Sequence, residues 1–154
     1  MDLTGDDLAG ILQEFGGLSP AELRQAIAET TFRAGEELPE EHIEAAVSAA
    51  IEEFSILPVA VEKRELLVAG PRAFPDPPEA AADLRHILEV SPREIPEAAR
   101  EAALRERLEN ELTLSPGPER ASELIEMTYD AEAWLAIDLS EVRSRLADRV
   151  EGES

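Results

Sequence analysis

The chain has 154 residues, of which 44% are hydrophobic and only 4% aromatic, so a core can form but must be filled mostly by aliphatic side chains. It carries 35 acidic against 14 basic residues, a formal net charge of −21, and it has no cysteine. These values exclude a disulfide framework and thiol chemistry, and they disfavour binding to nucleic acid, which rests on cations placed against phosphates.

The acidity is unusual in being poor in lysine. Lys63 is the only lysine, and the other 13 basic residues are arginines. A charge of this size repels itself and destabilises the compact state in dilute salt. In molar salt the Debye length falls to about 3 Å and the repulsion largely vanishes. We therefore expect a halophilic protein; an ordinary acidic protein from a GC-rich genome is the alternative.

The amino-terminal residues give no targeting signal. They are acidic where a signal peptide would be basic, and no long apolar stretch follows. No run approaches the 18 or more apolar residues of a membrane span. We expect a cytoplasmic protein with no membrane association.

Two capped helices are expected first. Thr4 is placed to cap a helix that the Gly16-Gly17 pair ends. The Ser19-Pro20-Ala21-Glu22 motif is a stronger start, with proline at the first helical position and glutamate placed to reach back to the cap. The second helix has two apolar faces, which is typical of a helix between neighbours; the second of these faces consists of Ala21, Ala28 and Phe32.

The stretch 38–70 organises the rest of the chain. A helix over 39–54 has the cleanest apolar stripe of the sequence, and its outer face is acidic. A hairpin follows, with strands over 56–61 and 65–69. Pro58 lacks a donor N–H, so its strand should lie at an edge of the sheet. The order helix, helix, helix, hairpin is that of a winged helix.

The carboxyl-terminal half is expected to be helical. The prolines at 71–78 mark a stiff, extended joint. The Ser91-Pro92-Arg93-Glu94 motif repeats the cap pattern of Ser19, a longer helix is expected from about Pro96 to Leu114, and further helices follow. We therefore predict a mostly α protein with a winged-helix-like unit over 1–70, a proline-rich joint over 71–78, and an appended helical unit over 79–154 packed on the first.

Candidate contacts for a partner or for nucleic acid are few. In helix-turn-helix proteins the recognition helix enters the major groove. Here the corresponding helix would present glutamates to phosphates. The cations available around it are Arg24, Arg33, Lys63 and Arg64. Winged helices also serve as protein-interaction modules, and the acidic third helix fits that role better than DNA binding.

No motif in the sequence indicates catalysis, a metal or a cofactor. His42 and His86 are the only histidines, and neither belongs to the spaced pairs that zinc sites use. No glycine-rich phosphate loop or Gly-x-Ser-x-Gly motif is present. We expect no metal, no cofactor and no enzymatic activity; an acid–base enzyme would need perturbed carboxyls in a pocket.

The only tyrosine and the only tryptophan, Tyr129 and Trp134, lie close together. They are candidate docking aromatics, because such residues anchor interfaces. The alternative, which we favour, is that Trp134 packs the carboxyl-terminal helices onto the winged-helix part, since the aromatic-poor core needs bulk.

Four segments carry a resemblance: 1–10 (MDLTGDDLAG), 18–24 (LSPAELR), 86–88 (HIL) and 129–134 (YDAEAW). With them the chain resembles a family of small acidic haloarchaeal proteins of unknown function. The resemblance spans nearly the whole chain, and it implies a halophilic origin but no site residues. The expected function is a non-enzymatic protein-interaction module with a protein partner; the alternative is a DNA-associated transcriptional regulator.

Overall fold

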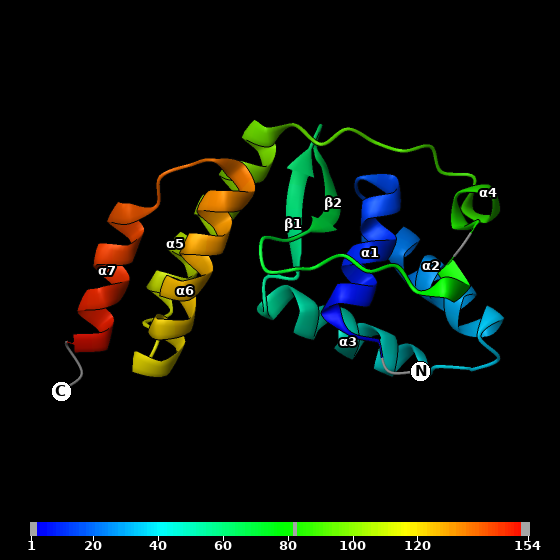
Figure 1. Ribbon diagram of the computed structural model, residues 1–154, viewed down its shortest axis with the longest axis horizontal. Helices are drawn as coiled ribbons and strands as arrows, with labels where there is room; N and C mark the ends of the chain where they lie inside the picture. Colours follow the sequence, from blue (N-terminus) through cyan, green and yellow to red (C-terminus); the bar gives the residue numbers. More distant parts are fainter. Residues whose placement is uncertain (1–2, 82, 152–154) are drawn as a thin grey trace. The chain divides into compact units, whose positions relative to one another are not determined.

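The computed structural model describes residues 3–81 and 83–151 (Figure 1). Within these residues the chain is mostly helical, with one two-stranded antiparallel hairpin after the third helix. The elements in chain order are α1 (Gly5–Phe15), α2 (Pro20–Arg33), α3 (Glu40–Glu52), β1 (Ile56–Val61), β2 (Arg64–Ala69), the 3-10 turn η1 (Glu79–Ala81), α4 (Leu84–Leu88), α5 (Glu97–Thr113), α6 (Pro118–Leu135) and α7 (Ser140–Glu151).

The first two helices begin at capping boxes, as predicted. The Thr4 hydroxyl accepts from the Asp7 backbone N–H at 3.1 Å, and the Asp7 carboxylate accepts from the Thr4 N–H at 3.0 Å. Ser19 and Glu22 make the same reciprocal pair at 3.2 and 2.8 Å. Each box satisfies two backbone N–H groups that a helix start would leave without a partner.

The core of the amino-terminal unit lies among α1, α2, α3 and the hairpin. Five side chains of α1 are fully buried, and four of them cluster with the inward face of α2 and residues from α3 and both strands. The core cluster consists of Leu8, Ile11, Leu12, Phe15, Leu18, Leu23, Ala26, Ile27, Ile43, Ala50, Ile56, Leu67, Ala81 and Leu84. As the composition requires, Phe15 is the only aromatic residue of this cluster.

The hairpin is the wing of the unit. Its register pairs Leu57 with Val68 and Val59 with Leu66. The outer edge of β2 pairs again with Leu18, which exchanges both backbone hydrogen bonds with Leu67, at 3.1 and 2.7 Å. Leu67 of β2 therefore has a partner on either side, whereas β1 lies at an edge of the sheet, where Pro58 lacks a donor. Helix order, hairpin and the short pairing at Leu18 make the amino-terminal part winged-helix-like.

The chain divides into two compact units, Met1–Pro96 and Glu97–Ser154. The division differs from the one expected at the proline-rich segment 71–78, because 71–96 belongs with the first unit. The backbone N–H groups of Phe74 and Asp76 donate to the side chain and the carbonyl of Asp6, at 2.9 and 3.1 Å. Ala81 and Leu84 are buried in the core described above. Whether the second unit packs on the first stays a prediction.

The cap pattern at Ser91 does not start a helix, since 89–96 has no regular structure; the long helix α5 begins at Glu97, close to the expected start at about Pro96. Pro96 explains the difference. It would be the fifth residue of a helix capped by Ser91, where its ring clashes with the preceding turn, and it biases Ile95 away from helical angles. The segment is held instead by Arg93, whose backbone N–H donates to the Phe15 carbonyl at 2.7 Å.

The second unit consists of α5, α6 and α7. Leu104, Leu108 and Leu112 of α5 are buried, as the sequence predicts. Figure 1 shows α6 and α7 as neighbouring helices joined by a short loop. At this loop the Asp138 carboxylate accepts from the Ser140 N–H at 2.9 Å and the Glu132 carboxylate accepts from the Leu139 N–H at 2.7 Å. In neither unit is any described helix both long and apolar enough to serve as a membrane span.

Candidate functional site

The outer face of α3 is the surface on which a winged helix would contact DNA. Its polar residues all lie exposed, as expected from the sequence; they are Glu40, Glu41, Glu44, Ser48 and Glu52. Phosphates brought to this face would meet four carboxylates. The face is therefore suited to a partner that does not present a polyanion.

The four candidate cations do not form one continuous basic surface. Arg24 and Arg33 are nine residues apart on α2, and at 100° per residue they lie on opposite sides of that helix. Lys63 lies in the turn at the tip of the hairpin, and Arg64 is the first residue of β2. The Arg64 side chain is half exposed and already donates to the Glu22 carboxylate at 3.3 Å.

Glu22 is the centre of an ionic cluster at the turn between α1 and α2. Arg93 donates to both of its carboxylate oxygens, at 2.7 and 3.0 Å, and to the Gly17 carbonyl at 3.0 Å. The hydrogen bonds from Arg93, supported by those from Ser19, lower the pKa of Glu22 from 4.5 to about 2 against the opposing effect of burial. The carboxylate of Glu22 therefore has a structural role, because it fixes the 89–96 segment to α1 and α2.

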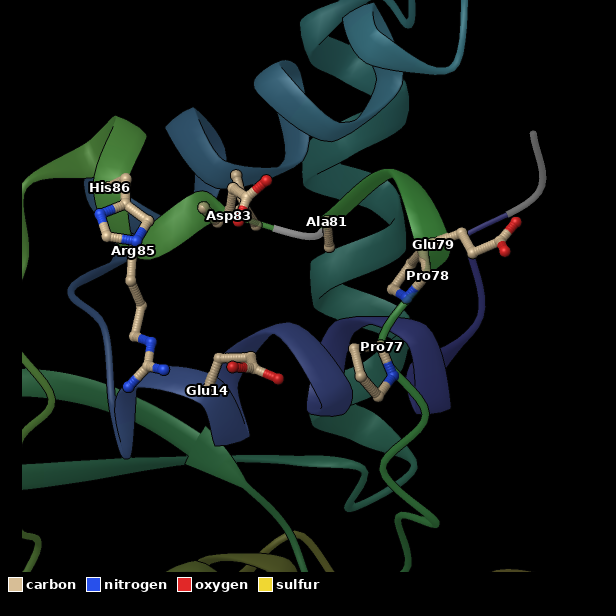
Figure 2. A pocket seen from close by; sticks show the side chains of 9 residues that line it. Glu14, Pro77, Pro78, Glu79, Ala81, Asp83, Arg85 and His86 are labelled. Carbon is tan, nitrogen blue, oxygen red and sulfur yellow. The ribbon is translucent and has the colours of Figure 1, made fainter.

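A hollow of about 320 Å³ lies among α1, the proline-rich segment and α4 (Figure 2). Its polar side chains come from separate elements: Glu14 from α1, Glu79 from η1, Asp83 from before α4, and Arg85 and His86 from α4. The other lining residues are Pro77, Pro78, Ala81 and Leu84. The charged side chains are all exposed, so the hollow is open to solvent.

The two histidines lie apart from any cluster of ligands. His86 lines the hollow and His42 is exposed on α3. Among the described residues, no three His, Asp or Glu side chains are grouped so that they could hold a metal ion.

Both candidate docking aromatics contact arginines of their own unit. The Arg143 guanidinium lies 4.2 Å from the centroid of the Tyr129 ring and donates to Glu132 at 2.7 Å. The Arg100 guanidinium lies 5.4 Å from the centroid of the Trp134 ring. Tyr129 remains 59% exposed, whereas Trp134 is partly buried. These contacts join neighbouring helices, and a docking role for either ring stays a prediction.

Comparison with known protein families gives one match, to a family of unknown function, DUF7109, over residues 6–151. The chain belongs to this family. Comparisons of this DUF7109 member with curated proteins and with solved structures find no match.

Two features of this DUF7109 member were not predicted from its sequence. The first is the pairing of Glu22 with Arg93, which are 71 residues apart, a spacing that carries no local signal. The second is a groove of about 410 Å³ at the end of α2, where Phe32 is 73% exposed. Phe32 belongs to the second apolar face of α2, and the expectation that neighbours bury that face is wrong. The helical spacing of this face can be read from the sequence, but the sequence does not show that no other element covers the face.

Proposed function

We propose that the chain is a non-enzymatic protein-interaction module that works in the cytoplasm of a halophile, with a protein partner that docks on the winged-helix surface. The observation that carries this proposal is the exposed acidic face of α3. In a winged helix that face is the one turned toward a partner, and here carboxylates cover it. Protein surfaces accept such a face, whereas a phosphate backbone repels it.

The halophilic part of the proposal is supported by composition and by the resemblance to acidic haloarchaeal proteins. The self-repulsion of a net charge of −21 destabilises the compact state in dilute salt and is largely screened in molar salt. The same salt screens attraction between exposed charges beyond about 3 Å. A partner must then be held by contacts at short range.

The non-enzymatic part is supported by where the polar groups lie. Among the described residues, the buried polar side chains are Thr30, Thr31, Ser55 and Thr128, and no carboxylate or histidine is among them. Acid–base catalysis uses groups whose pKa is shifted by burial in a pocket. The hollow of Figure 2 instead exposes its carboxylates to solvent.

Site-specific photo-crosslinking in cells grown in molar salt tests the proposal. A photoreactive residue placed at Ser48, in the middle of the acidic face of α3, should give a discrete protein adduct. The matched control is Ser122, an exposed serine on α6, which should give none. Adding Glu41→Arg and Glu44→Arg should abolish the Ser48 adduct. A nucleic-acid adduct at Ser48, or equal labelling at both serines, would contradict the proposal.

The alternative, a DNA-associated transcriptional regulator, is favoured by one observation: Lys63 lies at the exposed tip of the wing, with the half-exposed Arg64 next to it at the start of β2. In such a regulator these residues, with Arg24 and Arg33, would contact the DNA backbone. Binding to duplex DNA that falls steeply with salt and is weakened by Lys63→Glu would support this alternative.

A further inference from the structure

A preformed groove lies where α2 ends and α3 begins. Its lining is mixed: apolar side chains come from α2 and from the residues before α3, and Thr31 and two glutamates add polar groups. The lining residues are Ala28, Thr31, Phe32, Glu36, Glu37, Leu38 and Pro39. Phe32 is 73% exposed, one of four large hydrophobic side chains left exposed in the described chain.

The backbone around the groove is fixed by its own hydrogen bonds. The N–H of Glu36 donates to the Thr31 carbonyl at 2.9 Å, and the N–H of Gly35 donates to the Phe32 carbonyl at 3.0 Å. With Gly35 at φ +79°, this pair of bonds is a Schellman motif. Leu38 then packs against the core and holds the other side of the loop. A groove held in this way loses little conformational entropy when it is occupied.

The charge around the groove is negative. Glu37 lines it, and Glu40 and Glu41 follow directly after Pro39 in the exposed first turn of α3. Arg33 and Glu36 each already have an interaction within the chain. An incoming segment therefore meets an exposed phenyl ring and carboxylates close to it. That combination complements an apolar side chain flanked by cations and rejects an acidic segment.

We propose that this groove binds an extended basic segment of the partner protein, with one apolar side chain of that segment seated against Phe32. The inference rests on the proposed function, because it names the partner chemistry for the same winged-helix unit. In molar salt the apolar contact supplies the affinity, since burial of apolar surface is not screened as charge attraction is. The carboxylates act at contact distance and select basic segments over the acidic proteins of a halophilic cytosol.

Amide NMR of the full chain, titrated with three synthetic peptides in 0.2 M and 2 M KCl, tests the proposal. The first peptide has one leucine flanked on each side by two arginines; the second replaces its leucine by serine; the third replaces its arginines by glutamates. We expect the first peptide to shift the amide signals of 28–39 at both salt concentrations. Each of the other two should bind at least about tenfold more weakly.

Variants at two exposed positions distinguish binding in the groove from attraction to the general acidity of the chain. Phe32→Ser should weaken the first peptide at least about tenfold, because the anchor loses its contact surface. Leu114→Ser, at a residue that is 78% exposed in the other unit, is the matched control and should leave binding unchanged. Phe32→Leu should retain most of the affinity. Both positions are exposed, so neither change should disturb the core.

Several results would overturn the inference. These are equal binding of the leucine and serine peptides, binding of the glutamate peptide, shifts centred on the outer face of α3, or no effect of Phe32→Ser. Self-association that Phe32→Ser abolishes would assign the groove to a second copy of the chain instead. If crosslinking from Ser48 still gives a protein adduct while Phe32→Ser has no effect, the proposed function stands and this inference fails.

Discussion

Glu22 shows how one side chain can serve two levels of structure. Its carboxylate completes the capping box at the start of α2 and also receives both guanidinium N–H groups of Arg93. The first role is local, and the second holds a segment 71 residues away. Both favour the ionised carboxylate, which is why its pKa falls to about 2.

We predict that Glu22→Gln lowers the free energy of unfolding by about 1.5–3 kcal/mol at pH 7. The glutamine can still accept from Ser19, but its amide N–H₂ then faces the Arg93 guanidinium. Urea unfolding of both proteins measures the difference. Glu101→Gln is the control, since the exposed pair of Glu101 with Arg105 on α5 should be worth only about 0.3–0.5 kcal/mol.

We also predict that the stability difference between the wild type and Glu22→Gln depends on pH. The folded-state pKa of Glu22, about 2, lies below its ordinary value of 4.5, so its stabilisation is complete above about pH 5.5. It is lost as the pH falls from 4.5 toward 2, because the folded carboxylate must then be protonated. The stability difference between the wild type and Glu22→Gln should shrink over that range. A difference that stays constant down to pH 2.5 would contradict the role given to Glu22.

Two glycines with nearly the same φ give a second prediction at this scale. Gly16 and Gly35 have φ +80° and +79°, but a Cβ at Gly16 would overlap the Arg93 carbonyl oxygen, whereas one at Gly35 would meet nothing. We expect Gly35→Ala to cost about 1–2 kcal/mol from backbone strain alone. Gly16→Ala should cost clearly more, because the 89–96 segment must also move. Equal losses in thermal or urea unfolding would show that this segment is not held against α1.

At the scale of elements, the hairpin forms without the usual turn residues. Glu62 and Lys63 both have positive φ, at 51° and 66°, as a two-residue type I′ turn requires. Neither residue favours that region, so the turn is set by the pairing of β1 with β2 rather than by its own sequence. Arg64 accordingly belongs to β2, opposite Val61, whereas the sequence predicted a second strand that begins only at residue 65.

We predict that replacing Glu62-Lys63 by Asn-Gly stabilises the protein by about 1–2 kcal/mol, because these residues adopt positive φ with less strain. The measurement is urea unfolding, with the hairpin monitored by amide hydrogen exchange. Amide exchange in β1 and β2 should become slower. Amide exchange in α6 should change only as far as the free energy of global unfolding changes. A loss of stability would indicate that the charged tip has a structural role.

Two similar motifs show what the sequence can and cannot predict about elements. Ser19-Pro20-Ala21-Glu22 starts a helix as expected, because caps depend on neighbours within one turn. Ser91-Pro92-Arg93-Glu94 does not, because Pro96 and the distant Glu22 decide its conformation. The helices, the hairpin and the acidic face of α3 followed from local periodicity. The hollow beside α4 is formed by segments that are distant in sequence, and the groove at Phe32 exists because no element covers that face of α2. Local periodicity predicts neither feature.

At the scale of the whole molecule, net charge is the property with the widest consequences. If the charge of −21 is mainly repulsive, the free energy of unfolding should rise as KCl increases from 0.1 to 3 M. Repulsion scales with the square of the charge, so removing six charges, to −15, should roughly halve the gain, since (15/21)² is about 0.5. Suitable exposed residues for change to glutamine are Glu40, Glu41, Glu44, Glu53, Glu65 and Glu126. A salt dependence unchanged by the six substitutions would show that self-repulsion is not its cause.

The most direct test of the central claim, that an acidic α3 face excludes phosphate from the winged-helix surface, is a titration with duplex DNA from 0.05 to 2 M KCl. We predict no binding at any salt concentration, because four glutamates occupy the face that would meet the duplex. Binding at low salt that falls steeply as salt rises, and that Lys63→Glu and Arg24→Glu each weaken, would contradict the claim and support the regulator.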